Sequence, residues 1–306
     1  MMKFPKIEMD TLLKRLEPPK GRIRMVLDTD TYNDIDDQFA LVYALTSKEK
    51  LDVESIYAAP FLNKRSTSAA DGMEKSYQEI IRLLNKMNIS PEGLVHKGSN
   101  QFLTNYNEPI DSEAARDLIK RAMDSTEDSP LYVVSIAAIT NVASAILIEP
   151  EIINKIVVVW LGGHSLNWPD TMEFNVEQDI LAARVIFDSG VPVIQIPCMG
   201  VASHLLTTES ELEKHLSGKN MIGDALVEIF KNFKSDHYGW AREIWDIAAI
   251  AYLINPEWVP STIVHSPILT DQFTWSTDTR RHFMRTASFI KRNKVFKDMF
   301  EKISTL

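Results

Sequence analysis

The sequence contains little cysteine and little glycine, and each shortage excludes a class of protein. Cys198 is the single cysteine among 306 residues, which excludes internal disulfides and CxxC zinc ribbons and fits a reducing compartment. The 11 glycines argue against a glycine-rich loop that cradles phosphate, and the nucleotide-binding pattern GxGxxG is absent. The metalloprotease motif HExxH and the serine hydrolase motif GxSxG are absent as well. These absences narrow the chemistry that the chain can perform.

Long apolar runs and an excess of positive charge are also missing. No apolar stretch approaches the roughly 18 residues that a membrane-spanning helix needs, and the longest, 244–254, contains Asp246. Residues 1–22 are charged throughout and lack the apolar stretch of a secretory signal, so we expect a cytoplasmic protein. The net charge of −9 disfavours a nonspecific grip on nucleic acid. We therefore expect an enzyme that has neither nucleic acid nor a membrane as a partner.

What the sequence does contain is a regular alternation of short Val/Ile-rich runs with helical patterns. The expected strands are 23–28, 53–59, 131–136, 156–161 and 191–196, and the expected helices are 36–46, 68–87, 112–125, 142–148 and 177–188. This alternation predicts an α/β fold: a single open, mostly parallel (mixed) Rossmann-like β-sheet flanked by helices. The part after Pro197 is expected to be more helical and to end in a helix near 287–302. We expect an N-terminal extension at 1–21 and one domain at 22–306.

Five aspartates lie within ten residues, directly after the first expected strand. Asp28 and Asp30 share a face of an extended chain, and Asp36 and Asp37 open the next helix. Helix capping by Asp34, together with acids in the first turn, would account for part of this cluster. It does not account for like charges at the end of an apolar strand, where a hard divalent cation would offset their repulsion. Metal binding or catalysis is therefore one interpretation and helix capping is the other.

A second carboxylate stands alone in an apolar helix. From Ile244 to Ile254 the sequence is apolar except for Asp246, which is therefore expected to be buried. A buried carboxylate needs a cation or strong hydrogen-bond donors. Arg242, four residues earlier, is one possible partner, and a metal shared with the aspartates near residue 30 is the other.

The loop 162–175, after the expected strand 156–161, carries amides and a carboxylate. Asn167, Glu173 and Asn175 can accept hydrogen bonds from sugar hydroxyls, and the amides can also donate. Long loops at the carboxyl ends of strands commonly carry binding residues. The alternative is a turn-rich surface loop whose polar side chains satisfy the backbone. The pair Thr140-Asn141 by itself predicts only a helix N-terminus.

Taken together, these segments resemble the calcium-dependent inosine–uridine-type nucleoside hydrolases, which cleave the N-glycosidic bond of ribonucleosides. The resemblance covers residues 22–260. It is carried by Asp28-x-Asp30 with Asp36-Asp37, by Asn63, by Thr140-Asn141 with Glu149-Pro150, by Gly162-Gly163 with Asn167 and Glu173-Phe174-Asn175, and by Trp245-Asp246.

The resemblance implies a site and a role for each of its residues. It implies Ca²⁺ held by Asp30, Asp37, Asp246 and the backbone carbonyl of Thr140, with Asp30 also acting as the general base. The ribose hydroxyls would be held by Asp36, Asn63, Asn167, Glu173 and Asn175. It further implies a nucleoside substrate, a role in nucleoside salvage, and a homodimer or homotetramer.

Two departures from the usual family pattern bear on the substrate. The loop between Asp30 and Asp36 is two residues longer, so that Asp34 competes with Asp36 for the ribose role, and we favour Asp36. Trp245 replaces a histidine that many members carry, as in purine-preferring relatives, so we expect a purine preference with base contacts from Trp245, Tyr238 and Trp240. Packing of Trp245 into the core is the alternative. Two alternative functions remain: cleavage of another ribosyl compound, and metal-dependent binding of ribose without catalysis.

Overall fold

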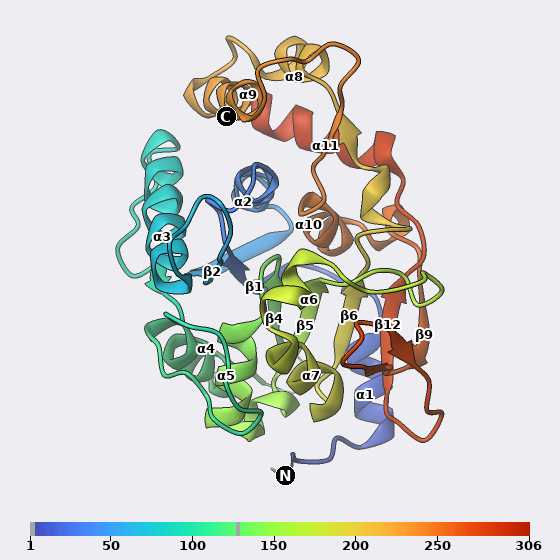
Figure 1. Ribbon diagram of the computed structural model, residues 1–306. Coiled ribbons are helices and arrows are strands. Elements are labelled where there is room, and N and C mark those ends of the chain that lie inside the picture. Colours follow the sequence, from blue (N-terminus) through green and yellow to red (C-terminus); the bar gives the residue numbers. More distant parts are fainter. Residues whose placement is uncertain (1–3, 127–128) are drawn as a thin grey trace.

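An eight-stranded β-sheet forms the centre of the molecule (Figure 1). The computed structural model describes residues 4–126 and 129–306. The strand order is β3-β2-β1-β4-β5-β6-β12-β9, and neighbours pair in parallel except β9, which runs antiparallel to β12. The strands are β1 (Ile23–Thr29), β2 (Leu51–Ala58), β3 (Val95–Lys97), β4 (Leu131–Ser135), β5 (Ile156–Leu161), β6 (Val193–Ile196), β9 (Ser261–His265) and β12 (Phe283–Ala287). The predicted open, mostly parallel sheet is confirmed.

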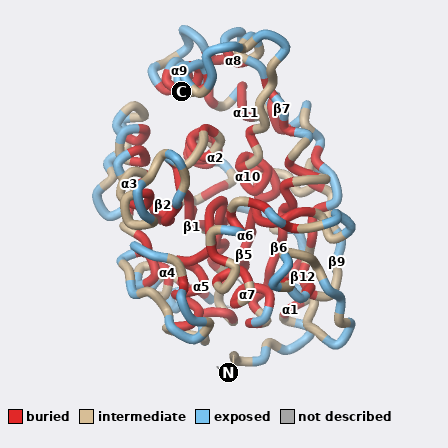
Figure 2. Tube along the Cα trace, viewed as in Figure 1, coloured by how far each residue is buried: buried red, intermediate tan, exposed pale blue. Residues whose placement is uncertain are grey.

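Helices cover both faces of the sheet, and apolar side chains fill the space beneath them (Figures 1 and 2). One face is covered by α2 (Asp36–Thr46), α3 (Ala69–Lys86), α8 (Glu209–Leu216), α9 (Met221–Phe233), α10 (Ile247–Ile254) and α11 (Arg292–Ser304). The other face is covered by α4 (Glu113–Met123), α5 (Thr140–Ile148) and α7 (Ile180–Ser189). The remaining short elements are α1 (Met9–Leu16), α6 (Phe174–Gln178), β7 (Leu206–Thr207), β8 (Arg242–Glu243), β10 (Ile268–Leu269) and β11 (Trp275–Ser276).

The continuous apolar runs of the strands follow from burial on both faces. Along β5, Val157 and Val159 pack beneath the first group of helices, whereas Val158 and Trp160 pack beneath the second. Successive side chains of a strand point to opposite faces, so a sheet that is covered twice has no position for a polar alternation. The Val/Ile-rich pattern in the sequence is the direct result.

Two expected helices differ in the structure. The helix expected at 177–188 is broken at Asp179, because its side chain accepts a hydrogen bond from the N–H of Ala182 and so begins α7 there. The same carboxylate also accepts from Leu103 N and Thr140 Oγ1, at 2.9 and 2.8 Å. The C-terminal part contains the expected helices, but the helix expected near 287–302 is preceded by strand β12 and begins only at Arg292.

The segment that precedes β1 packs against the sheet. In α1, Leu12 and Leu16 are buried, and the carbonyl of Leu16 accepts a 2.6 Å hydrogen bond from Arg285 Nε on β12. This contact joins residues 269 positions apart in the sequence. Within the described ranges, no helix combines the length and the apolar character needed to cross a membrane.

The order of the strands changes direction at β1. This strand pairs with β2 on one side and with β4 on the other, so the connection that follows β1 leads into one half of the sheet and the chain later crosses from β3 to β4 in the other half. In open α/β sheets, ligands bind outside the carboxyl ends of the strands at such a point. The loop 30–35 after β1 and the loop 136–139 after β4 meet there, and this is where the predicted site residues should gather.

Candidate active site

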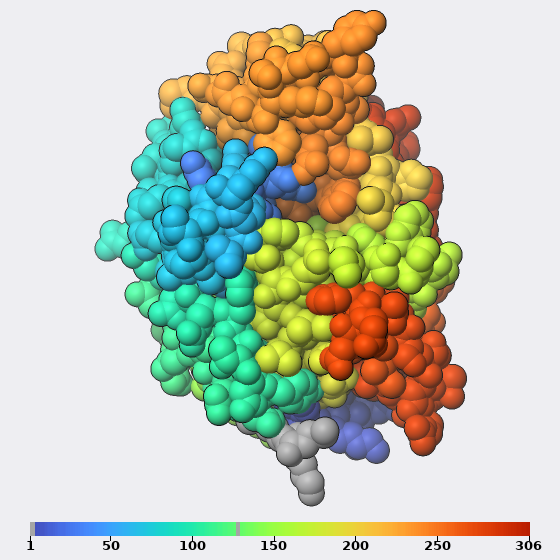
Figure 3. Space-filling view, in the orientation of Figure 1, coloured from blue at the N-terminus to red at the C-terminus, as the bar shows by residue number. Residues whose placement is uncertain are grey.

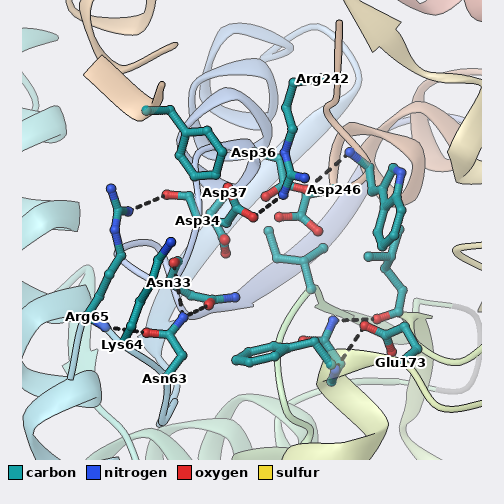
Figure 4. A pocket seen from close by; sticks show the side chains of 16 residues that line it. Asn33, Asp34, Asp36, Asp37, Asn63, Lys64, Arg65, Glu173, Arg242 and Asp246 are labelled. Carbon is teal, nitrogen blue, oxygen red and sulfur yellow. Dashed lines mark hydrogen bonds and ion pairs between the residues drawn. The ribbon is translucent and has the colours of Figure 1, made fainter. Parts of the chain in front are cut away.

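A pocket of about 280 Å³ opens at this edge of the sheet (Figures 3 and 4). Most of its wall comes from five segments: 33–37, 63–65, 173–175, Phe233 at the end of α9, and 242–246. In the space-filling view these segments surround a hollow where blue, yellow-green and orange surfaces meet. The volume is near the lower end of the range for small-molecule sites, about 300–1,000 Å³.

Three carboxylates from two ends of the chain meet in this pocket. One oxygen each of Asp36, Asp37 and Asp246 lies within 4.8 Å of the others. None of the three is spent on helix capping: Ile35 occupies the N-cap position of α2, and Asp246 at the N-cap of α10 makes no side-chain capping bond. The capping interpretation of Asp34 is therefore wrong.

Asp30 is buried beside this group, and neither of its carboxylate oxygens has a hydrogen-bond partner among residues 4–126 and 129–306. Burial, reinforced by the charges of Asp37 and Asp36, raises the pKa of Asp30 well above its ordinary value of 3.8. The pKa of Asp246 is raised in the same way, by burial and by the charges of Asp36 and Asp37. A buried carboxylate without donors is costly unless a cation accompanies it, so the residues fit a metal ion.

The partner of Arg242 is Asp34 and not Asp246. Arg242 Nη2 forms an ion pair with Asp34 Oδ2, while the backbone N–H of Trp245 donates to Asp36 Oδ2 at 3.1 Å (Figure 4). The loop after β1 is thereby tied to the segment before α10. The ion-pair interpretation of Asp246 is not what the structure shows.

Asp28 is separate from this group. It is fully buried and accepts 2.8 Å hydrogen bonds from Ser135 Oγ and from Asn141 Nδ2. Burial raises its pKa to about 7. Asn141 is therefore more than part of a helix start, because its other amide atom accepts from the N–H of Ser99 at 2.7 Å. This network fixes the base of the β1 and β4 loops.

Glu173 lies on the side of the pocket opposite Lys64 and Arg65 (Figure 4), and Asn175 lines the same pocket. Glu173 begins α6: its carboxylate accepts from the N–H groups of Gly163 and Asn175, at 2.8 and 2.9 Å. Burial raises the pKa of Glu173 to about 7. Asn175 Nδ2 donates to the carbonyl of Leu161 at 2.9 Å, which leaves its amide oxygen for a ligand. Both side chains are held rigidly by the backbone around them.

Asn63 joins two loops at the edge of the sheet. Its amide nitrogen donates to Asn33 Oδ1 at 2.6 Å, and its amide oxygen accepts from the N–H of Arg65 at 2.8 Å. The loop after β2 thereby supports the loop after β1. Asn63 and Asn33 both line the pocket.

The remaining predicted residues lie in different places. Trp245 lines the pocket, packs partly against the core, and has a buried indole N–H for which the described residues offer no partner. Thr140 is buried in the first turn of α5, after β4. Asn167 and Tyr238 are exposed, the latter to 97%, and Trp240 stacks on Phe233 with ring centres 6.2 Å apart. Within the described chain, the pocket wall includes neither these last three predicted residues nor Asp30 and Thr140.

The wall also contains residues that were not predicted, among them Asn33, Lys64, Arg65 and Phe233. Lys64 and Arg65 directly follow Asn63, which is the one signal that could have identified them. Phe233 ends α9, far from any polar motif in the sequence. Its position depends on how the C-terminal helices pack, which the sequence pattern does not show.

Comparison with known proteins points to one family. The sequence model of the family "Inosine-uridine preferring nucleoside hydrolase" matches residues 25–298. The pyrimidine-specific ribonucleoside hydrolase RihA of Escherichia coli O1:K1 is 25% identical over 261 residues, covering 76% of this chain and 80% of the relative.

Two solved structures show the same fold. A purine-preferring ribonucleoside hydrolase from Gardnerella vaginalis superposes with a TM-score of 0.73 at 21% identity, covering 92% of this chain and 98% of the other. The plant nucleoside hydrolase PpNRh1 superposes with a TM-score of 0.72 at 18% identity, covering 94% and 100%. The chain therefore belongs to the inosine–uridine preferring nucleoside hydrolase family and is a ribonucleoside N-glycosyl hydrolase.

Proposed function

We propose that the protein hydrolyses the N-glycosidic bond of ribonucleosides in a Ca²⁺-dependent reaction, with Asp30 as the general base. One observation carries this proposal: Asp30 is a buried carboxylate that has no hydrogen-bond partner in the described part of the chain and lies close enough to Asp36, Asp37 and Asp246 for their charges to interact. A fold does not stabilise such a group by itself, so its presence points to a cation and a reaction.

Asp30, Asp37, Asp246 and the carbonyl of Thr140 would hold the metal ion. Ca²⁺ is the favoured ion because three carboxylates and a carbonyl are all hard oxygen ligands. When bound, the ion would lower the pKa of a water molecule and so supply a nucleophile near neutral pH.

Asp30 would take the proton from the attacking water. It is positioned for this by β1, whose hydrogen bonds to β2 and β4 fix the backbone immediately before it. A base held on a rigid element needs little reorganisation when the proton moves. Replacement by Asn would therefore abolish hydrolysis, whereas a protein that merely binds ribose would retain its function.

The pocket walls would hold the ribose and stabilise the positive charge that develops on it. Glycosidic cleavage passes through an oxocarbenium-like transition state, which carboxylate and amide oxygens stabilise. Asp36, Asn63, Glu173 and Asn175 present such oxygens around one cavity. Asp36 is favoured over Asp34 for the ribose because the carboxylate of Asp34 is paired with Arg242.

We further propose a purine preference, with Trp245 beside the base. Its large aromatic face lines the pocket, and stacking on a base contributes about 1–3 kcal/mol. The buried indole N–H also lacks a partner and could donate to a ring nitrogen. The named relatives differ on this point, since RihA is described as pyrimidine-specific and the Gardnerella vaginalis enzyme as purine-preferring.

The test is the release of reducing sugar from inosine, adenosine, guanosine, uridine and cytidine. We expect ribose release with added Ca²⁺, loss of release with a chelator, and recovery when Ca²⁺ is restored. Asp30→Asn should bind nucleoside without hydrolysing it. Full activity in the presence of the chelator would contradict the metal dependence, and faster hydrolysis of uridine than of inosine would contradict the purine preference.

A further inference from the structure

Positively charged side chains gather on one side of the pocket, in a protein whose net charge is −9. Lys64, Arg65 and Arg242 all line the pocket, together with the ring of Phe233. Figure 4 shows Lys64 and Arg65 on the side away from Glu173, with Arg242 reaching in from another wall. Asp37 and Asp246, two of the carboxylates that would hold the metal, lie between these two sides.

The two arginines are held close together. Both guanidinium groups lie near the ring of Phe233, with their carbons 5.1 Å (Arg242) and 6.0 Å (Arg65) from its centre. Both also hold Asp34: Arg242 pairs with its carboxylate, and Arg65 Nη1 donates to its backbone carbonyl at 3.1 Å. The loop after β1 therefore brings the two charges to one place.

The carboxylates nearby neutralise only part of this group. Arg242 is paired with Asp34 and, at 3.9 Å, with Glu243, and its buried Nε has no hydrogen-bond partner among the described residues. The guanidinium group of Arg65 donates to the carbonyl oxygens of Tyr32 and Asp34 and has no carboxylate partner in the described part of the chain. Lys64 is exposed and has no ion pair among residues 4–126 and 129–306.

We propose that the substrate is an anionic ribosyl compound, whose phosphate or carboxylate is bound by Lys64, Arg65 and Arg242. Guanidinium groups present paired N–H donors that match a phosphate or a carboxylate, and an ammonium group adds a mobile charge. If the substrate were a neutral nucleoside, the free N–H donors of these side chains would bind only water. This inference rests on the proposed function, since it places the ribose between the metal ligands and Glu173, so that another part of the substrate faces the cations.

Two substrates distinguish the two sources of the negative charge. Uridine 5′-monophosphate carries it on the sugar and orotidine carries it on the base, and uridine is the neutral reference for both. We expect kcat/KM for one of these anions to exceed that for uridine by about 10-fold or more at low salt. Reducing-sugar release reports all three reactions, because ribose and ribose 5-phosphate are both reducing sugars.

Lys64→Gln tests the assignment to these residues, because an exposed side chain can be changed without disturbing the fold. We expect the ratio of kcat/KM for the preferred anion to that for uridine to fall about 5- to 10-fold. The matched control is Lys48→Gln, which removes the same charge before the start of β2, at the opposite edge of the sheet. It should leave the ratio within about 2-fold, because charges beyond the Debye length are screened.

Ionic strength gives an independent readout. The ratio should fall as salt rises from about 0.01 M to about 1 M, since the Debye length shrinks from about 30 Å to about 3 Å. Uridine hydrolysed as fast as both anions, or an equal ratio in Lys64→Gln and Lys48→Gln, would overturn the anionic substrate and leave the proposed function standing. No hydrolysis of any compound with Ca²⁺ present would refute the proposed function, and this inference with it.

Discussion

Replacing Asp246 by Asn should make the metal-free protein more stable while abolishing its response to Ca²⁺. Asp246 is buried and its oxygen lies within 4.8 Å of those of Asp36 and Asp37. The substitution keeps the shape of the side chain and removes one negative charge from this group. Most substitutions of a buried polar residue destabilise a protein, so a gain in stability would be a specific sign of charge repulsion.

The magnitude follows from the distances. Two unit charges 4.8 Å apart repel by about 3 kcal/mol at an effective dielectric constant of about 20. Because the native protein can relieve part of this repulsion by taking up a proton, we expect a net gain of about 1–3 kcal/mol in the free energy of unfolding. For a chain of this length, that corresponds to a rise in Tm of about 2–6 °C.

The assay is thermal unfolding with a chelator and with Ca²⁺. At a Ca²⁺ concentration 100 times the Kd, binding should stabilise the unmodified protein by about 2.7 kcal/mol. Asp246→Asn should show little of this shift. The matched control is Asp28→Asn, which is equally buried but accepts hydrogen bonds from Ser135 and Asn141. Here the same change should destabilise by about 1–3 kcal/mol, because one donor loses its acceptor.

The two variants are expected to change the Tm in opposite directions, so the charge-repulsion model can be refuted. If Asp246→Asn lowered the Tm in chelator as Asp28→Asn does, Asp246 would be a hydrogen-bonded structural residue and not a member of a repulsive group. If it kept the full Ca²⁺ shift, the metal would bind elsewhere. Either result would remove the basis of the proposed metal site.

Three further predictions concern the pocket walls. Glu173→Gln and Asn175→Ala should each lower kcat at least ~10-fold, about 1.4 kcal/mol, with a smaller change in KM, because the two side chains act on the charged transition state. Steady-state kinetics measures both constants, and a change confined to KM would contradict this prediction. Burial raises the pKa of Glu173 from 4.5 to about 7. As pH rises, this carboxyl group therefore loses its proton at a lower pH in the unfolded chain than in the folded one, and the free energy of unfolding falls between about pH 4.5 and about pH 7. Urea unfolding should show a fall of about 3 kcal/mol relative to Glu173→Gln over that range, and parallel pH profiles would contradict it. Trp245→Ala should reduce kcat/KM for inosine more than for uridine, and equal losses would argue against stacking.

The hydrophobic pattern of the sequence predicted those helices and strands whose limits depend on neighbouring residues in the chain. The helix expected at 36–46 and the strand expected at 156–161 match α2 and β5 residue for residue. The break at Asp179 is a local capping bond to Ala182, but the same carboxylate is also held by Leu103 and Thr140, which lie far away in the sequence and could not be predicted as its partners. Strand β12 was missed because its pairing with β6 and β9 is also non-local.

The same limit applies to the site. The aspartates could be identified from the sequence because like charges crowded at the end of an apolar strand repel one another unless a cation lies between them. The partner of Arg242 could not, since proximity in sequence suggested Asp246 whereas the fold places Asp34 there, 208 residues away. Phe233 and its two arginines became visible only once α9 was packed against the loops of the sheet.

The distance in sequence between the two halves of the carboxylate group has a consequence for the synthesis of the protein. Asp36 and the backbone of Trp245, which meet through a hydrogen bond, are 209 residues apart. At about 5–20 residues per second, a ribosome needs about 10–40 s to make the intervening chain. During that time β1, β2 and β4 are already available to pair, whereas the aspartates that follow β1 have none of their C-terminal neighbours. The pocket is therefore completed late, and a chain that stopped before residue 242 would carry the centre of the sheet without a site.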